Sequence, residues 1–237
     1  METTITKTPT VDIILPLYRT EIFVDELTCR LNSAMSAYRT TIIAVDDQSP
    51  DQSAQLIRQA ASRVNISCKV IVHDCNRGQH QAVLTGLANS TSDYSIVMDA
   101  DLQDPPEVVP SLIKRINISG NGIAFGQRDS IHRNWLEEFT SSLFKGLVLR
   151  RLGVKTTSAI GMFFAITSFS RAELLQLPDT DAYLPAMLLA LQHPQFHVGY
   201  ERQGSGRSSG YSLRSRINLA QRANRWITNF KKENRTL

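Results

Sequence analysis

The sequence predicts an α/β protein built on a doubly wound, mostly parallel sheet. In the first half of the chain, short β-branched runs alternate with segments whose apolar residues recur at helical spacing, which is typical of βαβ units. The chain has 237 residues, which suits one large domain or two small ones. Apolar residues make up 42% and charged residues 20%, so the chain can bury a sizeable core and disorder is excluded.

Five strands are expected in the first half of the chain. Runs of β-branched and apolar residues place them at residues 11–15, 41–45, 69–73, 94–98 and 122–125. Three helices are expected between the first four strands, because apolar residues recur there at helical spacing: Phe23, Leu27, Leu31, Ala34 and Met35; Leu56, Ala60 and Val64; and Val83, Leu87 and Ala88. Residues 11–126 therefore form the predicted sheet and its helices.

The second half of the chain is less regular. It contains a helical stretch over about residues 134–152, an apolar run over 161–166 and a helical segment around 181–192. A Gly/Ser-rich stretch at 203–210 leads into a final helix. Because there is neither an internal repeat nor a long linker, we expect one main domain over residues 1–210, followed by a basic amphipathic helix over residues 211–237.

The composition limits where the protein is expected to work. No apolar run approaches the roughly 18–20 residues of a membrane-spanning helix, and residues 1–9 do not resemble a secretion signal. We therefore expect a cytoplasmic protein, with Cys29, Cys68 and Cys75 as reduced thiols.

The net charge of +4 is concentrated in the C-terminal tail. From Arg202 onward, nine Lys or Arg residues accompany a single acid, Glu233. Composition alone leaves nucleic acid, anionic lipid headgroups and a phosphorylated substrate open as partners. The helical spacing of apolar residues in the tail fits two arrangements, a helix lying in a lipid interface and a helix packed on the main domain.

Acidic residues follow the second and the fourth predicted strands. In an open parallel sheet, ligands bind beyond the carboxyl ends of the strands, so residues 46–51 and 99–104 are the candidate site. Asp99 and Asp101 are separated by one small residue and can face a common point. That pattern suits Mg²⁺ or Mn²⁺ completed by substrate phosphate oxygens, although an Asp-x-Asp after a strand can also cap a turn.

Three ordered segments resemble family-2 glycosyltransferases, in particular the polyprenyl-phosphate branch that includes dolichyl-phosphate mannose synthases and undecaprenyl-phosphate sugar transferases. They are Asp-Asp-Gln-Ser-Pro-Asp at 46–51, Asn-Arg-Gly-Gln-His-Gln-Ala at 76–82 and Met-Asp-Ala-Asp-Leu-Gln-Asp-Pro-Pro-Glu at 98–107. The resemblance extends over about residues 11–230. It implies a GT-A fold with a nucleotide-sugar site at the carboxyl ends of the strands.

The resemblance also implies roles for individual residues. Those on the nucleotide-sugar side would be Pro16, Tyr18, Asp47, Asp99 and Arg207. Asp101 would be the principal ligand of Mg²⁺ or Mn²⁺, with Asp99 and Gln103 beside the metal. Arg207, in a segment resembling the family's Gly-Lys/Arg-Ser-(Gly/Lys)-Tyr-Ser, would lie on the donor diphosphate. Arg128 and Arg133 would bind the acceptor, because a guanidinium matches phosphate oxygens.

The chain also departs from the family pattern, and the segment around Arg207 has one extra residue. The family usually has Tyr-Asn-Glu after the first strand, where this chain has Tyr-Arg-Thr-Glu at 18–21, so uridine, guanosine and thymidine donors all stay open. Related enzymes often continue into membrane-spanning helices where this sequence stops. His80, at a helix start, is expected to be a packing or capping residue and not a catalytic base.

Taken together, the sequence predicts a metal-dependent inverting hexosyltransferase that moves a sugar from a nucleotide-sugar to a polyprenyl phosphate. The catalytic residues are expected to be Asp101, Arg128 and Arg207. A phosphate acceptor needs no strong general base, whereas a sugar hydroxyl acceptor does. The only candidates for such a base in the sequence are Asp179 and Asp181, and neither is convincing. The alternatives are transfer to a saccharide in cell-surface polysaccharide assembly and a catalytically silent nucleotide-sugar-binding scaffold.

Partners follow from the same hypothesis. The acidic candidate site argues against nucleic acid, and no nucleic-acid partner is expected. The basic tail leaves open a peripheral position on the inner face of the membrane, and a homo-oligomer also stays open.

Overall fold

A computed structural model describes residues 8–117, 121–128, 161–178, 183–201 and 213–233. Within these ranges, seven strands form one sheet in the order β3-β2-β1-β4-β6-β5-β7. Their bounds are Thr10–Leu17 for β1, Arg39–Asp46 for β2, Ser67–Val72 for β3, Tyr94–Val97 for β4, Ile123–Arg128 for β5, Phe164–Thr167 for β6 and Gln195–Tyr200 for β7. All neighbouring strands are parallel except β6, which runs antiparallel to both β4 and β5.

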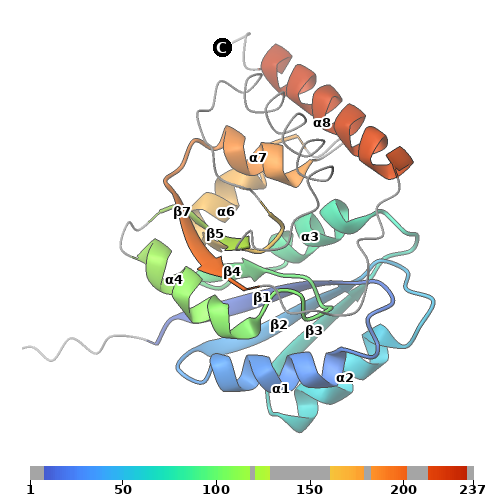
Figure 1. Cartoon of the computed structure of the whole chain (residues 1–237), viewed down its shortest axis with the longest axis vertical. Coiled ribbons are helices and arrows are strands. Elements are labelled where there is room, and N and C mark those ends of the chain that lie inside the picture. The colour runs from blue at the N-terminus through green and yellow to red at the C-terminus, as the bar shows by residue number, and fades with distance from the viewer. Residues whose placement is uncertain (1–7, 118–120, 129–160, 179–182, 202–212, 234–237) are drawn as a thin grey trace, which may run out of the picture.

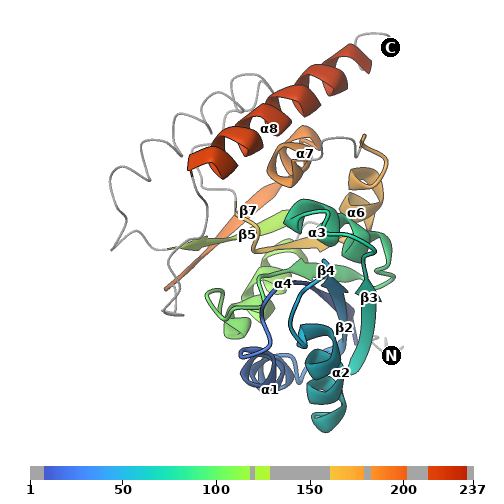
Figure 2. The same cartoon turned by 90° about the vertical axis from the view of Figure 1, so that its right-hand side faces the viewer.

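Helices cover both faces of the sheet (Figures 1 and 2). Their bounds are Val24–Ala34 for α1, Ser53–Arg63 for α2, Gln79–Ala88 for α3, Val109–Asn117 for α4, Ser168–Leu174 for α6, Leu184–Ala190 for α7 and Leu213–Glu233 for α8, with a 3₁₀ turn at Pro106–Val108. Figure 2 shows α1 and α2 on one side of the sheet and α3, α7 and α8 on the other.

The alternation of side chains along β1 explains the two layers. Val11, Ile13 and Leu15 point to the face covered by α1, α2 and α4, whereas Ile14 points to the face covered by α3, α7 and α8. Residues 11–15 and Leu17 of β1 are buried, whereas Thr10 and Pro16 are only partly buried. Because β1 pairs in parallel with β2 and β4, and β2 pairs in parallel with β3, the carboxyl ends of these four strands meet at one edge.

The predicted doubly wound, mostly parallel sheet is confirmed, and all five predicted strands are present. The apolar run at 161–166 contributes β6, and the helical segment around 181–192 contains α7. β7 was not predicted. The predicted helix over 134–152 lies outside the described residues.

The apolar face of α8 packs on the main fold. Ala223, Trp226 and Ile227 are buried in the same cluster as α3 and α7, and the Trp226 indole donates a hydrogen bond to the Pro178 carbonyl at 2.7 Å. The sequence left open whether the tail lies in a lipid interface or packs on the main domain. These side chains show that α8 packs on the main domain. In the described part of the chain, every helix is too short or too polar to cross a bilayer. The domain boundary at residue 210 stays a prediction.

We expect Gly86→Ala to destabilise the fold, because α3 lies against β1 at this residue. A Cβ at Gly86 would lie 2.3 Å from Cγ2 of Ile14, a branched and rigid side chain. We expect the free energy of unfolding in urea to fall by about 1–3 kcal/mol, despite the better helix propensity of Ala. Gly161→Ala is the control, since its nearest neighbour would be the Phe163 nitrogen at 3.8 Å. Equal stability of the two variants would contradict this close approach.

Candidate active site

The loops that follow β1, β2, β3 and β4 form the candidate site at one edge of the sheet. Parallel pairing aligns Leu17 of β1 with Asp46 of β2, and Asp46 with Val72 of β3. The edge consequently gathers residues 18–21, 47–52, 73–78 and 98–104. These four loops are far apart in the sequence but adjacent in the fold.

Asp47 anchors the loop between β3 and α3. The residue is 4% exposed, and its two carboxylate oxygens accept hydrogen bonds from the backbone nitrogens of Arg77 at 2.8 Å and Gly78 at 2.7 Å. His73 Nδ1 lies 2.8 Å from Asp47 Oδ1, and its Nε2 lies 3.0 Å from the Thr85 hydroxyl. With Nδ1 donating to the carboxylate, Nε2 accepts the hydroxyl proton, so one tautomer of His73 satisfies all three groups.

The loop held by Asp47 leads directly into α3. Gly78 adopts φ of +86° immediately before the helix, a conformation that favours glycine, and no atom lies within 4 Å of a Cβ placed there. The Asn76 amide donates to the Asp47 carbonyl at 3.1 Å and closes the loop from the other side. The amino end of α3, with its backbone donors, is thereby fixed beside the acidic turn, which we define as the loop of residues 98–104 after β4.

The acidic turn after β4 carries the candidate metal ligands. Asp99 and Asp101 are both partly buried. Gln79, the first residue of α3, donates from Nε2 to Asp99 Oδ1 at 2.5 Å, and the Gln103 backbone nitrogen donates to Asp101 Oδ1 at 3.1 Å. Both carboxylates are therefore oriented by neighbouring groups at the edge where a ligand would bind.

The oxygen ligands of this turn fit a divalent cation whose coordination is completed by substrate phosphate oxygens and water. Among the residues that the structure describes, no group of three or more His, Cys, Asp or Glu side chains is arranged to hold a metal ion. Mg²⁺ and Mn²⁺ in nucleotide sites need only one or two carboxylates, because phosphate oxygens and water supply the remaining ligands. Asp99 and Asp101 meet that smaller requirement.

The loop after β1 is tied to the loop after β2. The Arg19 nitrogen donates to the Ser49 hydroxyl at 2.8 Å, and the Thr20 nitrogen donates to the Ser53 hydroxyl at 3.0 Å. Burial acts to raise the pKa of Asp51, but hydrogen bonds from Ser49 and Ser53 outweigh it and lower the pKa. Asp51 therefore stays ionised and holds the two loops together.

Tyr18 presents an aromatic ring at the same edge. Tyr18 is 45% exposed, and the Arg19 guanidinium lies 5.6 Å from the centroid of its ring. Arg19 has φ of +56°, which an L-residue rarely adopts, so the surrounding loops hold it in place. The departure of this chain from the usual Tyr-Asn-Glu thus gives an aromatic–cation pair next to the predicted nucleotide position.

Residues 12–174 match the family model "Glycosyl transferase family 2", which is more than half of the chain. The chain belongs to this family. An undecaprenyl-phosphate 4-deoxy-4-formamido-L-arabinose transferase of Edwardsiella ictaluri is 28% identical over 88% of this chain, and this chain spans 65% of that relative's length. A dolichol-phosphate mannosyltransferase of Pyrococcus furiosus is 37% identical over 50% of this chain and 33% of its own.

A solved structure with low sequence identity has the same fold. Glucosyl-3-phosphoglycerate synthase from Mycobacterium tuberculosis, in complex with Mn²⁺, UDP-glucose and phosphoglyceric acid, superposes with a TM-score of 0.69 at 16% identity, over 93% of this chain and 79% of that one. The predicted GT-A fold is confirmed, with the mostly parallel sheet and the acidic turn at its carboxyl edge.

The structure gathers most, but not all, of the predicted site residues of this family-2 chain. Pro16 and Tyr18 at the end of β1, Asp47, Asp99, Asp101 and Gln103 lie at the one edge. Arg128 is the last residue of β5, but the structure does not describe its side chain. The described residues do not include Arg133, Arg207, Asp179 and Asp181. The roles expected for all these residues stay predictions.

His73 and Gln79 belong to the candidate site but were not predicted from the sequence. His73 orients Asp47, and Gln79 orients Asp99. His73 ends the predicted third strand, and Gln79 lies inside the second of the three family-like segments, so position alone could have marked both. Their partners could not be read from the sequence, because they lie 26 and 20 residues away.

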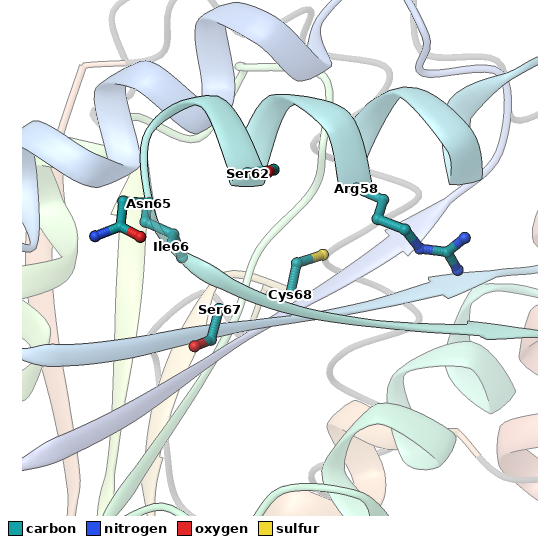
Figure 3. A pocket seen from close by; sticks show the side chains of 6 residues that line it. All are labelled: Arg58, Ser62, Asn65, Ile66, Ser67 and Cys68. Carbon is teal, nitrogen blue, oxygen red and sulfur yellow. The ribbon is translucent and has the colours of Figure 1, made fainter.

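A hollow of about 290 Å³ lies away from this edge, at the amino end of β3 (Figure 3). It is lined by Arg58, Ser62, Asn65, Ile66, Ser67 and Cys68. Burial raises the pKa of the Cys68 thiol to about 11, so the thiol is unreactive at neutral pH. Because ligands of such sheets bind beyond the carboxyl ends of the strands, this hollow is not the candidate site.

His80 is expected to make stability depend on pH. The side chain is 7% exposed and packs edge-on against the Tyr183 ring, and burial, aided by the charge of Arg222, lowers its pKa to about 4. Unfolding restores a pKa near 6.5, so the unfolded state takes up the proton first as the pH falls. The contribution of the neutral His80 to the free energy of unfolding is fully present above about pH 6.5 and is lost as the pH falls towards 4.

The measurement is the free energy of unfolding at pH 7 and at pH 5. The His80 contribution to the loss between these values is about 2 kcal/mol, and His80→Gln should remove that part of it. If the variant loses as much stability as the wild type over this range, the assignment of the pH dependence to His80 is wrong.

Proposed function

We propose that this chain is a metal-dependent, inverting hexosyltransferase that moves a sugar from a nucleotide-sugar to a polyprenyl phosphate. The observation that carries the proposal is the acidic turn with Asp99 and Asp101, oriented beside the amino end of α3 at the carboxyl edge of the sheet. Membership of glycosyl transferase family 2 supports the reaction class.

The donor would lie across the edge with its diphosphate at the acidic turn. A bound Mg²⁺ or Mn²⁺ would neutralise the charge that develops on the departing nucleoside diphosphate. Asp101, with Asp99 and Gln103, would hold the metal, while Pro16, Tyr18 and Asp47 would border the nucleotide. The presence of Mn²⁺ and UDP-glucose in the structure of the Mycobacterium tuberculosis enzyme supports the use of a divalent metal and a nucleotide-sugar. The base stays open among uridine, guanosine and thymidine.

The acceptor assignment rests on the relatives and on chemistry. The relatives named above act on undecaprenyl phosphate and dolichol phosphate. A phosphate oxygen is ionised near neutral pH and can attack the anomeric carbon, from the face opposite the nucleotide, without a strong general base. Arg128 and Arg133 would hold that phosphate, and Arg207 would hold the donor diphosphate.

A polyprenyl acceptor brings the enzyme to a membrane surface. We propose that α8 faces the headgroups with its outer side, because its inner side is used for packing and Arg225 and Lys232 are exposed. Co-sedimentation with phosphatidylglycerol vesicles should weaken in the double variant Arg225→Gln, Lys232→Gln, and it should be unchanged in Arg58→Gln, which removes an exposed cation on α2. Equal binding of all three proteins would remove the membrane part of the proposal.

The reaction itself is tested by release of nucleoside diphosphate. UDP-, GDP- and dTDP-sugars are incubated with Mg²⁺ or Mn²⁺, with undecaprenyl phosphate, dolichyl phosphate or an oligosaccharide as acceptor. We expect nucleoside diphosphate to be released from one of the donors, and this release should require both the metal and a polyprenyl phosphate. Release with the oligosaccharide alone would point to polysaccharide assembly. Donor binding without release would identify a silent scaffold.

A further inference from the structure

A buried hydrogen bond joins the end of the acidic turn to the last residue of β7. The Tyr200 hydroxyl donates to Oδ1 of Asp104, a residue 96 positions earlier in the sequence. Asp104 is 1% exposed and Tyr200 is 5% exposed. A carboxylate that is buried this deeply needs hydrogen-bond partners of this kind.

Packing on β5 fixes the direction of the Tyr200 ring. Its centroid lies 5.4 Å from that of Phe163, with the planes at 85°. Both rings lie against Gly126, where a Cβ would approach Phe163 Cδ1 to 2.4 Å and Tyr200 Cε1 to 2.9 Å. Only glycine at this position leaves room for both rings. The hydroxyl is therefore aimed at Asp104 by rigid neighbours, independently of the turn.

The turn that Asp104 ends is strained. Leu102 adopts φ of +61°, a conformation that an apolar L-residue adopts only when its surroundings impose it. Leu102, Gln103 and Asp104 are all buried, so the chain enters the core directly after Asp101. Gln79 holds the start of the turn through Asp99, and Tyr200 holds its end through Asp104.

We propose that Tyr200 is a positioning residue of the metal site. Its hydroxyl fixes Asp104, and the strained turn transmits that constraint to Asp101 and Gln103, which lie within three residues of Asp104. This inference rests on the proposed function, since it concerns the affinity of the same acidic turn for a divalent cation. Groups that orient metal ligands without touching the metal typically change affinity by 10- to 100-fold.

Tyr200→Phe tests the inference, because it removes only the hydroxyl and keeps the ring between Phe163 and Gly126. Mn²⁺ binding is followed by the electron paramagnetic resonance signal of the free ion, with UDP, GDP or dTDP present. We expect the dissociation constant for Mn²⁺ to rise roughly 10-fold. Amide hydrogen exchange over residues 99–104, measured without metal or nucleotide, should also accelerate.

Tyr94→Phe is the matched control. Its hydroxyl also makes a side-chain hydrogen bond, to Asn117 Oδ1 at 2.7 Å, but at the other end of β4. The control should bind Mn²⁺ as the wild type does. Asp104→Asn provides a second variant, because its neutral amide oxygen accepts from Tyr200 more weakly than a carboxylate oxygen does. Its affinity for Mn²⁺ should lie between those of the wild type and Tyr200→Phe.

The outcomes separate this inference from the proposed function. If the wild type binds Mn²⁺ and Tyr200→Phe binds it equally well, the positioning role is overturned while the metal site stands. If Tyr200→Phe does not fold, Asp104→Asn provides the test. Wild-type affinity for Mn²⁺ together with wild-type amide exchange at residues 99–104 in this variant would overturn the positioning role. Absence of Mn²⁺ binding by the wild type with every nucleotide would remove the metal site and this inference with it.

Discussion

Asp101→Asn is expected to reduce sugar transfer by at least about 100-fold, an effect typical of losing a group that stabilises charge on a leaving group. The substitution keeps the size of the side chain and an oxygen that can accept from the Gln103 nitrogen. It removes the negative charge that would hold the cation. The measurement is the initial rate of nucleoside diphosphate release at saturating donor, together with Mn²⁺-dependent nucleotide binding.

Glu107→Gln is the control for Asp101→Asn. Glu107 is an exposed acid six residues further on, and it pairs with Arg30 at 2.6 Å on the surface. Arg30 is partly buried and binds both carboxylate oxygens of Glu107, so loss of this pair is expected to cost about 1 kcal/mol of stability and to leave the candidate site intact. Comparable rates for Asp101→Asn and Glu107→Gln would refute the role assigned to Asp101.

Asp47→Ala is expected to have the largest effect on stability, a loss of about 3 kcal/mol in the free energy of unfolding. The substitution leaves the backbone donors of Arg77 and Gly78, and the ring of His73, without their acceptor. Each abandoned buried donor typically costs about 1–3 kcal/mol. The loop before α3 should loosen as a result, and nucleotide affinity should fall with it. Chemical denaturation and nucleotide titration measure the two effects.

The matched control for Asp47→Ala is Asp74→Ala, in the loop that Asp47 anchors. Asp74 is exposed and pairs with Arg77 through the side chain at 2.7 Å. Because exposed ion pairs contribute little, its loss should cost less than about 1 kcal/mol. A stability loss in Asp47→Ala no greater than in this control would show that the buried carboxylate does not anchor the loop.

The first half of the fold could be predicted because each element carries its own periodic signal. β1 is apolar on both faces, and α1 repeats Leu27 and Leu31 at helical spacing, so neither element depends on distant partners to be recognised. The site followed from a topological rule, which places residues after parallel strands at a common edge. Asp99 and Asp101 were therefore found without knowledge of any contact.

The second half could not be predicted to the same extent, for physical reasons. β7 has a mixed pattern in which Phe196 and Val198 are only partly buried and His197 lies between them, so its period-two signal is weak. The four residues of β6 are all buried, and such a short apolar run does not reveal its direction. The antiparallel insertion between β4 and β5 depends on tertiary pairing.

The contacts that orient the site were likewise hidden from the sequence. Asp47 resembles a nucleotide-contacting residue of the family, yet in the structure its oxygens are engaged by the loop before α3. Its contact with the nucleotide stays a prediction. The hydrogen bond from Tyr200 to Asp104 joins residues that are 96 positions apart in the sequence. It also depends on Gly126, which leaves room for the Tyr200 ring. Long-range geometry of this kind carries no local pattern.

The most direct test of the account is the anomalous scattering of Mn²⁺ in crystals soaked with the nucleoside diphosphate that binds most tightly. The account predicts an anomalous peak within about 2.5 Å of an Asp101 carboxylate oxygen, with phosphate oxygens completing the coordination. Nucleotide bound at the sheet edge with Mn²⁺ elsewhere, or with none near Asp101, would contradict it.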